Sequence, residues 1–299
     1  MAWLLLLAVF IIWFIIFLRK KLTFKFGLSP KVLEVQPIKG LKKLNDDLEQ
    51  SLTRSYMENV ENRVKEENKL KENEYEWRLL DLKRYFILTS LLKEAPMFSK
   101  KVDELWHHML MFTREYDDFS KKYLGATLHH SPNVKAKSDP DLRGFFDWVY
   151  AELFLIRKEN IYLYKGFFRY PVNPTVIEDF KNLSEEELLD LYFKSDTKYL
   201  NTVLALIASM KKTVRKVRDY QKSVIYDKME KSKREQKFNS MVVPFLSVSY
   251  FHYEEFASYL KVGSDSSASC TSCGSGSSCS SHSSCSSDSS CSSCGGGSD

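Results

Sequence analysis

The chain has 299 residues, of which 43% are hydrophobic and 28% charged, so there is room for one large domain or two small ones with appendages. The formal net charge of +5 is too small to call for a nucleic-acid partner. All six cysteines lie between Cys270 and Cys294, which excludes a fold stapled throughout by disulfides. The body of the chain must therefore hold together by packing alone.

The first predicted element is a membrane anchor. Residues 2–18 form an unbroken apolar run, which as a helix would cover about 26 Å, roughly the hydrocarbon thickness of a bilayer. The run has neither the basic start nor the small-residue cleavage site of a signal peptide. We therefore expect an uncleaved single-pass transmembrane helix.

Four cations follow this run and would contact anionic lipid headgroups: Arg19, Lys20, Lys21 and Lys25. No Lys or Arg precedes it. The positive-inside rule then places the N-terminus outside the cell and the bulk of the chain in the cytoplasm. The expected localisation is the cell membrane, with membrane lipid as one partner.

The composition divides the chain into four parts. Residues 1–25 are the predicted anchor and its basic flank, and residues 26–44, which include Pro30, Pro37 and Gly40, form a stalk. Residues 45–262 form a helical cytosolic domain, and residues 263–299 a disordered Ser/Cys-rich tail. The expected fold class is mostly α, with an irregular multi-helix domain that contains one long helix.

Several local patterns mark helices inside this domain. Apolar and aromatic residues from Val102 to Tyr123 recur at spacings of three and four, which predicts one helix over residues 100–124 that ends at Gly125. Ser184 with Glu187 forms a capping box for a short helix.

Two longer helices are expected further along. Asp139 and Pro140 mark the start of a helix whose residues 145–155 are apolar on nearly every side, as is typical of a buried central helix. After Ser195 a heptad spacing predicts one long helix to about Gln236.

The last part of this long helix is basic. Between Lys211 and Lys237 there are eleven Lys or Arg against four acids. A solvated helix face is the ordinary interpretation of such a stretch, and binding to anionic lipid or nucleic acid is the alternative.

Four of the six histidines fall within one segment, and they are the strongest candidates for chemistry. If residues 100–124 are one helix, Asp103 precedes His107 by one turn on the face opposite the core stripe. His129 and His130 follow in a loop that can fold back along the helix. Two or three histidines with an aspartate suit Zn²⁺ or another divalent ion.

Two other interpretations of these histidines stay open. They can be structural side chains in a hydrogen-bond network, or one of them can be a catalytic acid or base. Their spacing matches no standard zinc signature such as H-E-x-x-H.

The same segment carries a recognisable pattern. Its residues are Val102, Asp103, Trp106, His107, Thr113, Tyr116, Phe119, Gly125, His129, His130 and Pro132. In this order they resemble the signature of the glycine-rich-domain-containing protein family, roughly V-D-x-x-W-H, T-x-x-Y-x-x-F-C, G and H-H-x-P. The chain departs from it at Ser120, where the family carries Cys, and in its tail, which has few glycines. The resemblance implies a helical domain and no particular reaction.

The tail holds the second candidate metal site. Residues 264–299 contain 19 serines and six cysteines and cannot bury enough apolar surface to fold alone. Two C-x-x-C pairs could hold one ion through four thiolates: Cys270, Cys273, Cys291 and Cys294. A tail without a defined ligand, and a tail that is acylated or modified by oxidation, are the alternatives.

The leading functional hypothesis is a membrane-anchored helical binding or scaffold domain without enzymatic activity. In this hypothesis the histidine segment either organises the core or holds a divalent metal such as Zn²⁺, the Cys-rich tail is a second candidate for metal binding, and other proteins are candidate partners. The second hypothesis is a metal-dependent enzyme with His107 and His130 as ligands, supported by Asp103 or Asp147. The third is a sensor of anionic lipid surfaces through residues 211–237.

Overall fold

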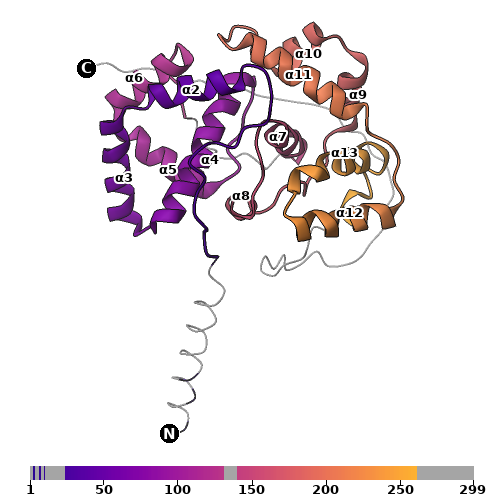
Figure 1. Cartoon of the computed structure of the whole chain (residues 1–299), viewed down its shortest axis with the longest axis horizontal. Coiled ribbons are helices and arrows are strands. Elements are labelled where there is room, and N and C mark those ends of the chain that lie inside the picture. The colour runs from indigo at the N-terminus through magenta and orange to yellow at the C-terminus, as the bar shows by residue number, and fades with distance from the viewer. Residues whose placement is uncertain (1–2, 4–6, 8–9, 11–23, 131–139, 261–299) are drawn as a thin grey trace, which may run out of the picture. The chain divides into compact units, whose positions relative to one another are not determined.

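The computed structural model describes Trp3, Leu7, Phe10 and residues 24–130 and 140–260 (Figure 1). These residues are mostly helical, and the pairing of extended chain among them is limited to two isolated bridges. The elements are α2 (Leu41–Ser51), α3 (Arg54–Asn68), α4 (Glu72–Leu91), α5 (Lys100–Leu110), α6 (Thr113–Leu124), α7 (Pro140–Leu153), α8 (Lys158–Leu163), α9 (Pro174–Asn182), α10 (Glu185–Tyr192), α11 (Leu200–Val214), α12 (Lys222–Glu235), the 3-10 helix η1 (Phe238–Met241), α13 (Val242–Phe251) and α14 (Phe256–Tyr259).

The predicted membrane anchor is not supported. No helix among the described residues has both the length and the apolar character needed to cross a bilayer. This finding overturns the predicted single-pass transmembrane architecture and the localisation in the cell membrane. Of the apolar run, Trp3, Leu7 and Phe10 are described and exposed, and the other residues of the predicted anchor lie outside the described part.

The helices pack in two groups around one apolar core. In the first group α4 contacts α2, α5 and α8, and α5 also contacts α3 and α6. In the second group α11 contacts α7, α9, α10 and α13, while α12 and α14 complete it. Figure 1 shows α4 and α7 as the central helices of the body. Few residues of either helix are exposed after the first turn, so both helices are buried on most of their circumference.

A buried polar network joins the two groups. Arg84 on α4 and Tyr150 on α7 are hydrogen-bonded at 2.8 Å, and the Tyr150 hydroxyl also donates to the carboxylate of Asp81. The other oxygen of that carboxylate accepts a bond of 2.9 Å from Asn160 on α8. Because each of these polar groups is bonded to another, three helices can meet in the core without an unpaired charge.

The segment before α2 packs along these central helices. Trp77 donates its indole N–H to the carbonyl of Gly27 at 2.9 Å, and Arg84 donates twice to the carbonyl of Leu33, at 3.1 and 2.7 Å. Val35 forms an antiparallel bridge with Phe154. Residues 24–40 therefore contribute both apolar and polar contacts to the body.

The predicted helix over residues 100–124 is in fact two helices. α5 ends at Leu110 and α6 begins at Thr113, because Phe112 has non-helical backbone angles (φ −93°, ψ 68°). The hydroxyl of Tyr56 on α3 donates to the Met109 carbonyl at 2.9 Å, and its ring packs edge-on against Phe112. Contacts from another helix thus stabilise the break, and the apolar spacing alone does not reveal it.

The predicted long helix after Ser195 is also divided. α11 ends at Val214 and α12 begins at Lys222. Between them the Arg218 amide donates to the Ser247 hydroxyl at 3.3 Å, and Asp219 pairs with His252 at 2.8 Å. Both partners belong to α13 or its end, so tertiary contacts turn the chain where the sequence has neither glycine nor proline.

Candidate metal site

Helix α5 sets the first two side chains of the site. The Ser99 hydroxyl accepts a bond from the Val102 amide at 3.3 Å and donates to the Leu163 carbonyl at 2.8 Å, so the start of α5 is both capped and anchored. Val102 is buried. Asp103 and His107 lie one turn apart on a more accessible face.

A hydrogen-bonded chain brings the third side chain to this face. α6 ends at Leu124, and the next residue, Gly125, turns the backbone with its φ of +83°. The indole N–H of Trp106 donates to the Tyr116 hydroxyl at 3.0 Å, and that hydroxyl donates to the Leu128 carbonyl at 2.7 Å. The backbone two residues before His130 is therefore tied to α5 and α6.

Asp103, His107 and His130 form one cluster. Nε2 of His130 lies 2.8 Å from Oδ1 of Asp103, and Nδ1 of His107 lies 3.9 Å from Oδ2 of Asp103. One ligand atom from each residue can be chosen so that all three lie within 4.8 Å of one another. The side chains are 8% exposed for His130, 29% for Asp103 and 52% for His107, so the cluster opens to solvent on the His107 side.

Packing fixes the orientation of the His130 ring. Its centroid lies 4.4 Å from that of Trp106 and 4.6 Å from that of His107, in both cases edge to face. Trp106 is itself buried among aromatic rings of α4. The imidazole is therefore held between a rigid wall and the accessible His107.

The donor set fits a divalent transition metal. Ligands of a tetrahedral zinc ion lie about 2.1 Å from the metal and hence about 3.4 Å from one another. The three atoms of the cluster need small side-chain rotations to reach this spacing. Two imidazoles and one carboxylate leave at least one coordination position open.

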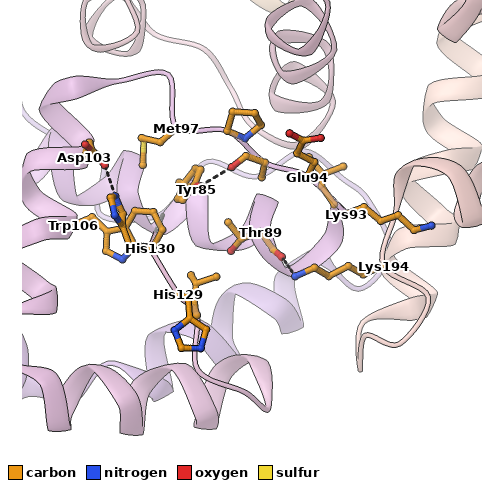
Figure 2. Close-up of a pocket in the computed structure, with 14 residues that line it drawn as sticks. Tyr85, Thr89, Lys93, Glu94, Met97, Asp103, Trp106, His129, His130 and Lys194 are labelled. Atoms are coloured by element: carbon orange, nitrogen blue, oxygen red, sulfur yellow. Dashed lines mark hydrogen bonds and ion pairs between the residues drawn. The ribbon is translucent and has the colours of Figure 1, made fainter. Parts of the chain in front are cut away.

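A cleft of about 400 Å³ begins at this cluster (Figure 2). Asp103, Trp106 and His130 line one end of it, and Lys194 lies at the other. Its remaining lining residues are Tyr85, Thr89, Leu92, Lys93, Glu94, Ala95, Pro96, Met97, Leu128 and His129. The cleft thus lies between the second half of α4, the α4–α5 loop and the segment after α6.

Two other histidines of the segment lie apart from the cluster. His129 lines the cleft, and Figure 2 shows its ring well away from Asp103. Nδ1 of His108 faces Glu67 at 3.6 Å, and burial lowers the pKa of its imidazole. The structure therefore brings together His107, His130 and Asp103, and separates His129 from them.

Asp147, the alternative supporting carboxylate, belongs to a different network. It is fully buried, accepts a bond of 2.7 Å from Arg143 and another of 2.7 Å from the Phe168 amide. Burial raises its pKa to about 6, and the Arg143 guanidinium opposes this shift. Ser120, where the resemblance placed a cysteine, is buried and donates to the Tyr116 carbonyl at 2.8 Å.

Other predicted binding residues lie mostly outside the described part of the chain. Arg19, Lys20 and Lys21 lie outside it, as do the tail cysteines Cys270, Cys273, Cys291 and Cys294. Lys25 is described and exposed. The basic residues 211–237 span the end of α11, the turn and α12, where ion pairs with Glu230 and Glu235 offset part of their charge.

Two features of the site were not predicted from the sequence. The Trp106–Tyr116 hydrogen bond supports the cluster, and both residues stood in the recognised pattern without an assigned role. Lys194, two residues after α10, lines the cleft, and no local signal in the sequence points to it.

A family model described as UCP032817-like matches residues 48–151. The range contains all three residues of the cluster. The matched family is not the glycine-rich-domain-containing family, so the resemblance predicted from the sequence is wrong. No curated protein matches the chain, and no solved structure matches it.

Proposed function

We propose that this chain is a helical binding domain that binds one divalent transition-metal ion through Asp103, His107 and His130. The observation that carries the proposal is the convergence of three ligand atoms to within 4.8 Å of one another. The residues come from two segments that a break at residues 111–112 and the turn at Gly125 fold together.

The surroundings of the cluster support a binding role. Trp106 packs against the His130 ring, and the Trp106–Tyr116–Leu128 chain of hydrogen bonds holds the backbone that carries it. Partners of this kind orient ligands before the ion arrives, which lowers the entropy cost of binding.

The donor types indicate which ions fit. Imidazole nitrogens favour Zn²⁺, Ni²⁺, Co²⁺ or Fe²⁺, whereas Mg²⁺ and Ca²⁺ prefer sites made of oxygen ligands. Since His107 is half exposed, the ion exchanges with solvent more readily than in a buried four-ligand structural site.

Isothermal titration of the full chain with Zn²⁺ tests the proposal. The six tail cysteines are first replaced by serine, so that thiolates do not compete for the ion. We expect one ion per chain, and at least about tenfold weaker binding in His130→Ala, as one ligand of three is lost. His129→Ala is the matched control, since it removes the neighbouring imidazole and should bind Zn²⁺ as the parent does.

A second variant separates loss of a ligand from loss of structure. His107 is half exposed, so His107→Ala should keep the parent circular dichroism spectrum and thermal stability while Zn²⁺ affinity falls. Equal Zn²⁺ affinity in the parent, His107→Ala and His130→Ala would contradict the proposal.

A further inference from the structure

The proposed metal position opens into the cleft. Asp103 and His130 are both members of the cluster and lining residues of the cleft. An ion held by three protein side chains keeps an open coordination position, which water or a ligand can take. The cleft is the hollow beside these two residues, so a small molecule in it can reach that position.

The far end of the cleft carries a cation. The Lys194 ammonium donates to the Thr89 carbonyl at 2.7 Å and pairs with no carboxylate in the part of the chain that the structure describes. Lys93, by contrast, is paired with Asp190 at 3.6 Å. Glu94 also lines the cleft, but its carboxylate lies well away from the Lys194 ammonium in Figure 2. Lys194 therefore offers a positive charge to an incoming ligand.

Between the two ends the walls include five apolar residues beside polar ones: Leu92, Ala95, Pro96, Met97 and Leu128. The Tyr85 hydroxyl donates to the Ala95 carbonyl at 2.7 Å and is thus already engaged. The apolar side chains offer contacts to the aliphatic carbons of a ligand whose charged groups lie at the two ends.

We infer that the cleft binds a small dicarboxylate with an aliphatic middle. One carboxylate completes the coordination of the metal, and the other pairs with Lys194. The inference rests on the proposed metal binding. A divalent ion with one carboxylate and two neutral imidazoles retains one positive charge, and Lys194 supplies a second, so a dianion matches the two ends. A cleft of about 400 Å³ is in the range that holds small metabolites.

The test uses the full chain with its tail cysteines replaced by serine and loaded with Zn²⁺. It is titrated with malonate, succinate, glutarate, adipate and suberate, and with butyrate and hexanoate as monocarboxylate controls. We expect affinity to peak at one chain length and to exceed that of the monocarboxylates by about tenfold, as a charge-assisted hydrogen bond at Lys194 is worth at least that much. Equal affinity for mono- and dicarboxylates at every length overturns the inference.

Two lysine variants test whether the second carboxylate of the ligand pairs with Lys194. Lys194→Met should remove the preference for the dicarboxylate and leave hexanoate affinity unchanged, which also shows that the cleft is intact. Lys93→Met, on the same cleft but already paired with Asp190, should keep the preference. A preference that survives Lys194→Met overturns the assignment.

The failure of this inference is distinguishable from failure of the proposed function. If Zn²⁺ binds but no dicarboxylate does, the metal site stands and the inference is wrong. If Zn²⁺ does not bind, both are wrong. Dicarboxylate binding of the same strength with and without Zn²⁺ overturns the metal-bridged arrangement.

Discussion

Single buried charges decide how the interior of this protein holds together. Arg84 is fully buried, and its guanidinium donates to the carbonyls of Leu33 and Leu155 as well as to the Tyr150 hydroxyl. Asp81 lies 3.9 Å away and is also fully buried. Removing one member of such a network leaves the others buried without a partner, and this strongly destabilises the folded state. Replacing both charged members by apolar side chains would cost much less.

The first prediction concerns Arg84→Met. The buried carboxylate of Asp81 loses its neighbouring cation and two carbonyls lose their donors, so the free energy of unfolding should fall by about 3–5 kcal/mol. Urea denaturation followed by circular dichroism measures this. Lys83→Met, one residue away, breaks a surface pair with Glu49 and should cost about 1 kcal/mol or less. Similar losses in the two variants would show that the network is not important.

The second prediction concerns the pH dependence due to Asp147. Its folded-state pKa is about 6 against an ordinary 3.8, because burial disfavours the charged form. The folded state therefore binds the proton more tightly than the unfolded state, so the contribution of Asp147 to stability is fully present below about pH 4 and is lost as pH rises through 6. The difference corresponds to about 3 kcal/mol.

Urea denaturation between pH 4 and 7 checks this sign. Relative to Asp147→Asn, which cannot ionise, the parent should lose stability as pH rises across that window. Asp118→Asn removes an exposed carboxylate and should follow the parent. A parent curve that rises relative to Asp147→Asn would show that pairing with Arg143 outweighs burial.

At the scale of elements, two glycines limit how helices begin, end and approach one another. Gly144 on α7 lies so close to the chain at Pro171 that a Cβ would come within 2.1 Å of the Pro171 oxygen. Gly125 at the end of α6 has open space around it, and its constraint is the positive φ of +83° alone. Position 144 therefore requires glycine because there is no space for a side chain, and position 125 favours glycine because of its backbone conformation.

The third prediction separates these reasons. Gly144→Ala should destabilise by about 3 kcal/mol, because the backbone at Pro171 must move. Gly125→Ala should cost about 1 kcal/mol from backbone strain, and Gly125→Asn less, since asparagine tolerates this conformation better. Thermal denaturation of the three variants gives the order. A larger loss for Gly125→Ala than for Gly144→Ala would contradict it.

At the scale of the whole body, the segment before α2 is part of the fold. Leu33 is buried, and the carbonyls of Gly27 and Leu33 accept bonds from Trp77 and Arg84. These contacts reach α4, which also meets α7 and α8 through the polar network. The segment thus covers the junction between the two groups of helices.

The fourth prediction is that a chain starting at residue 41 is less stable than one starting at residue 24. Lost hydrogen bonds and the exposed apolar surface should together cost on the order of 5 kcal/mol. Leu33→Ala in the intact chain keeps the carbonyl that Arg84 needs and should cost about half as much. Urea denaturation compares the three, and equal stability of the two chain lengths would rule out a structural role for residues 24–40.

What the sequence by itself determined is local. The mostly helical class, the capping box of Ser184 with Glu187, the end of a helix before Gly125 and the burial of residues 146–151 follow from neighbouring residues, and the structure confirms each. Leu155, at the end of the predicted apolar stretch, is exposed instead. Caps and periodicity act over one or two turns, so they can be recognised without knowing the fold.

The tertiary structure decided the breaks at residues 111–112 and 215–221, because the groups that stabilise them come from α3 and α13. It also decided that His130 rather than His129 meets Asp103, and that Lys194 faces the same cleft. Two predictions went beyond local structure. The hydropathy of residues 2–18 predicts a membrane anchor, and the pattern around His107 predicts membership of the glycine-rich-domain-containing family; both predictions are wrong. Residues far apart in the chain meet only through the packing of the helices between them, which no local pattern specifies.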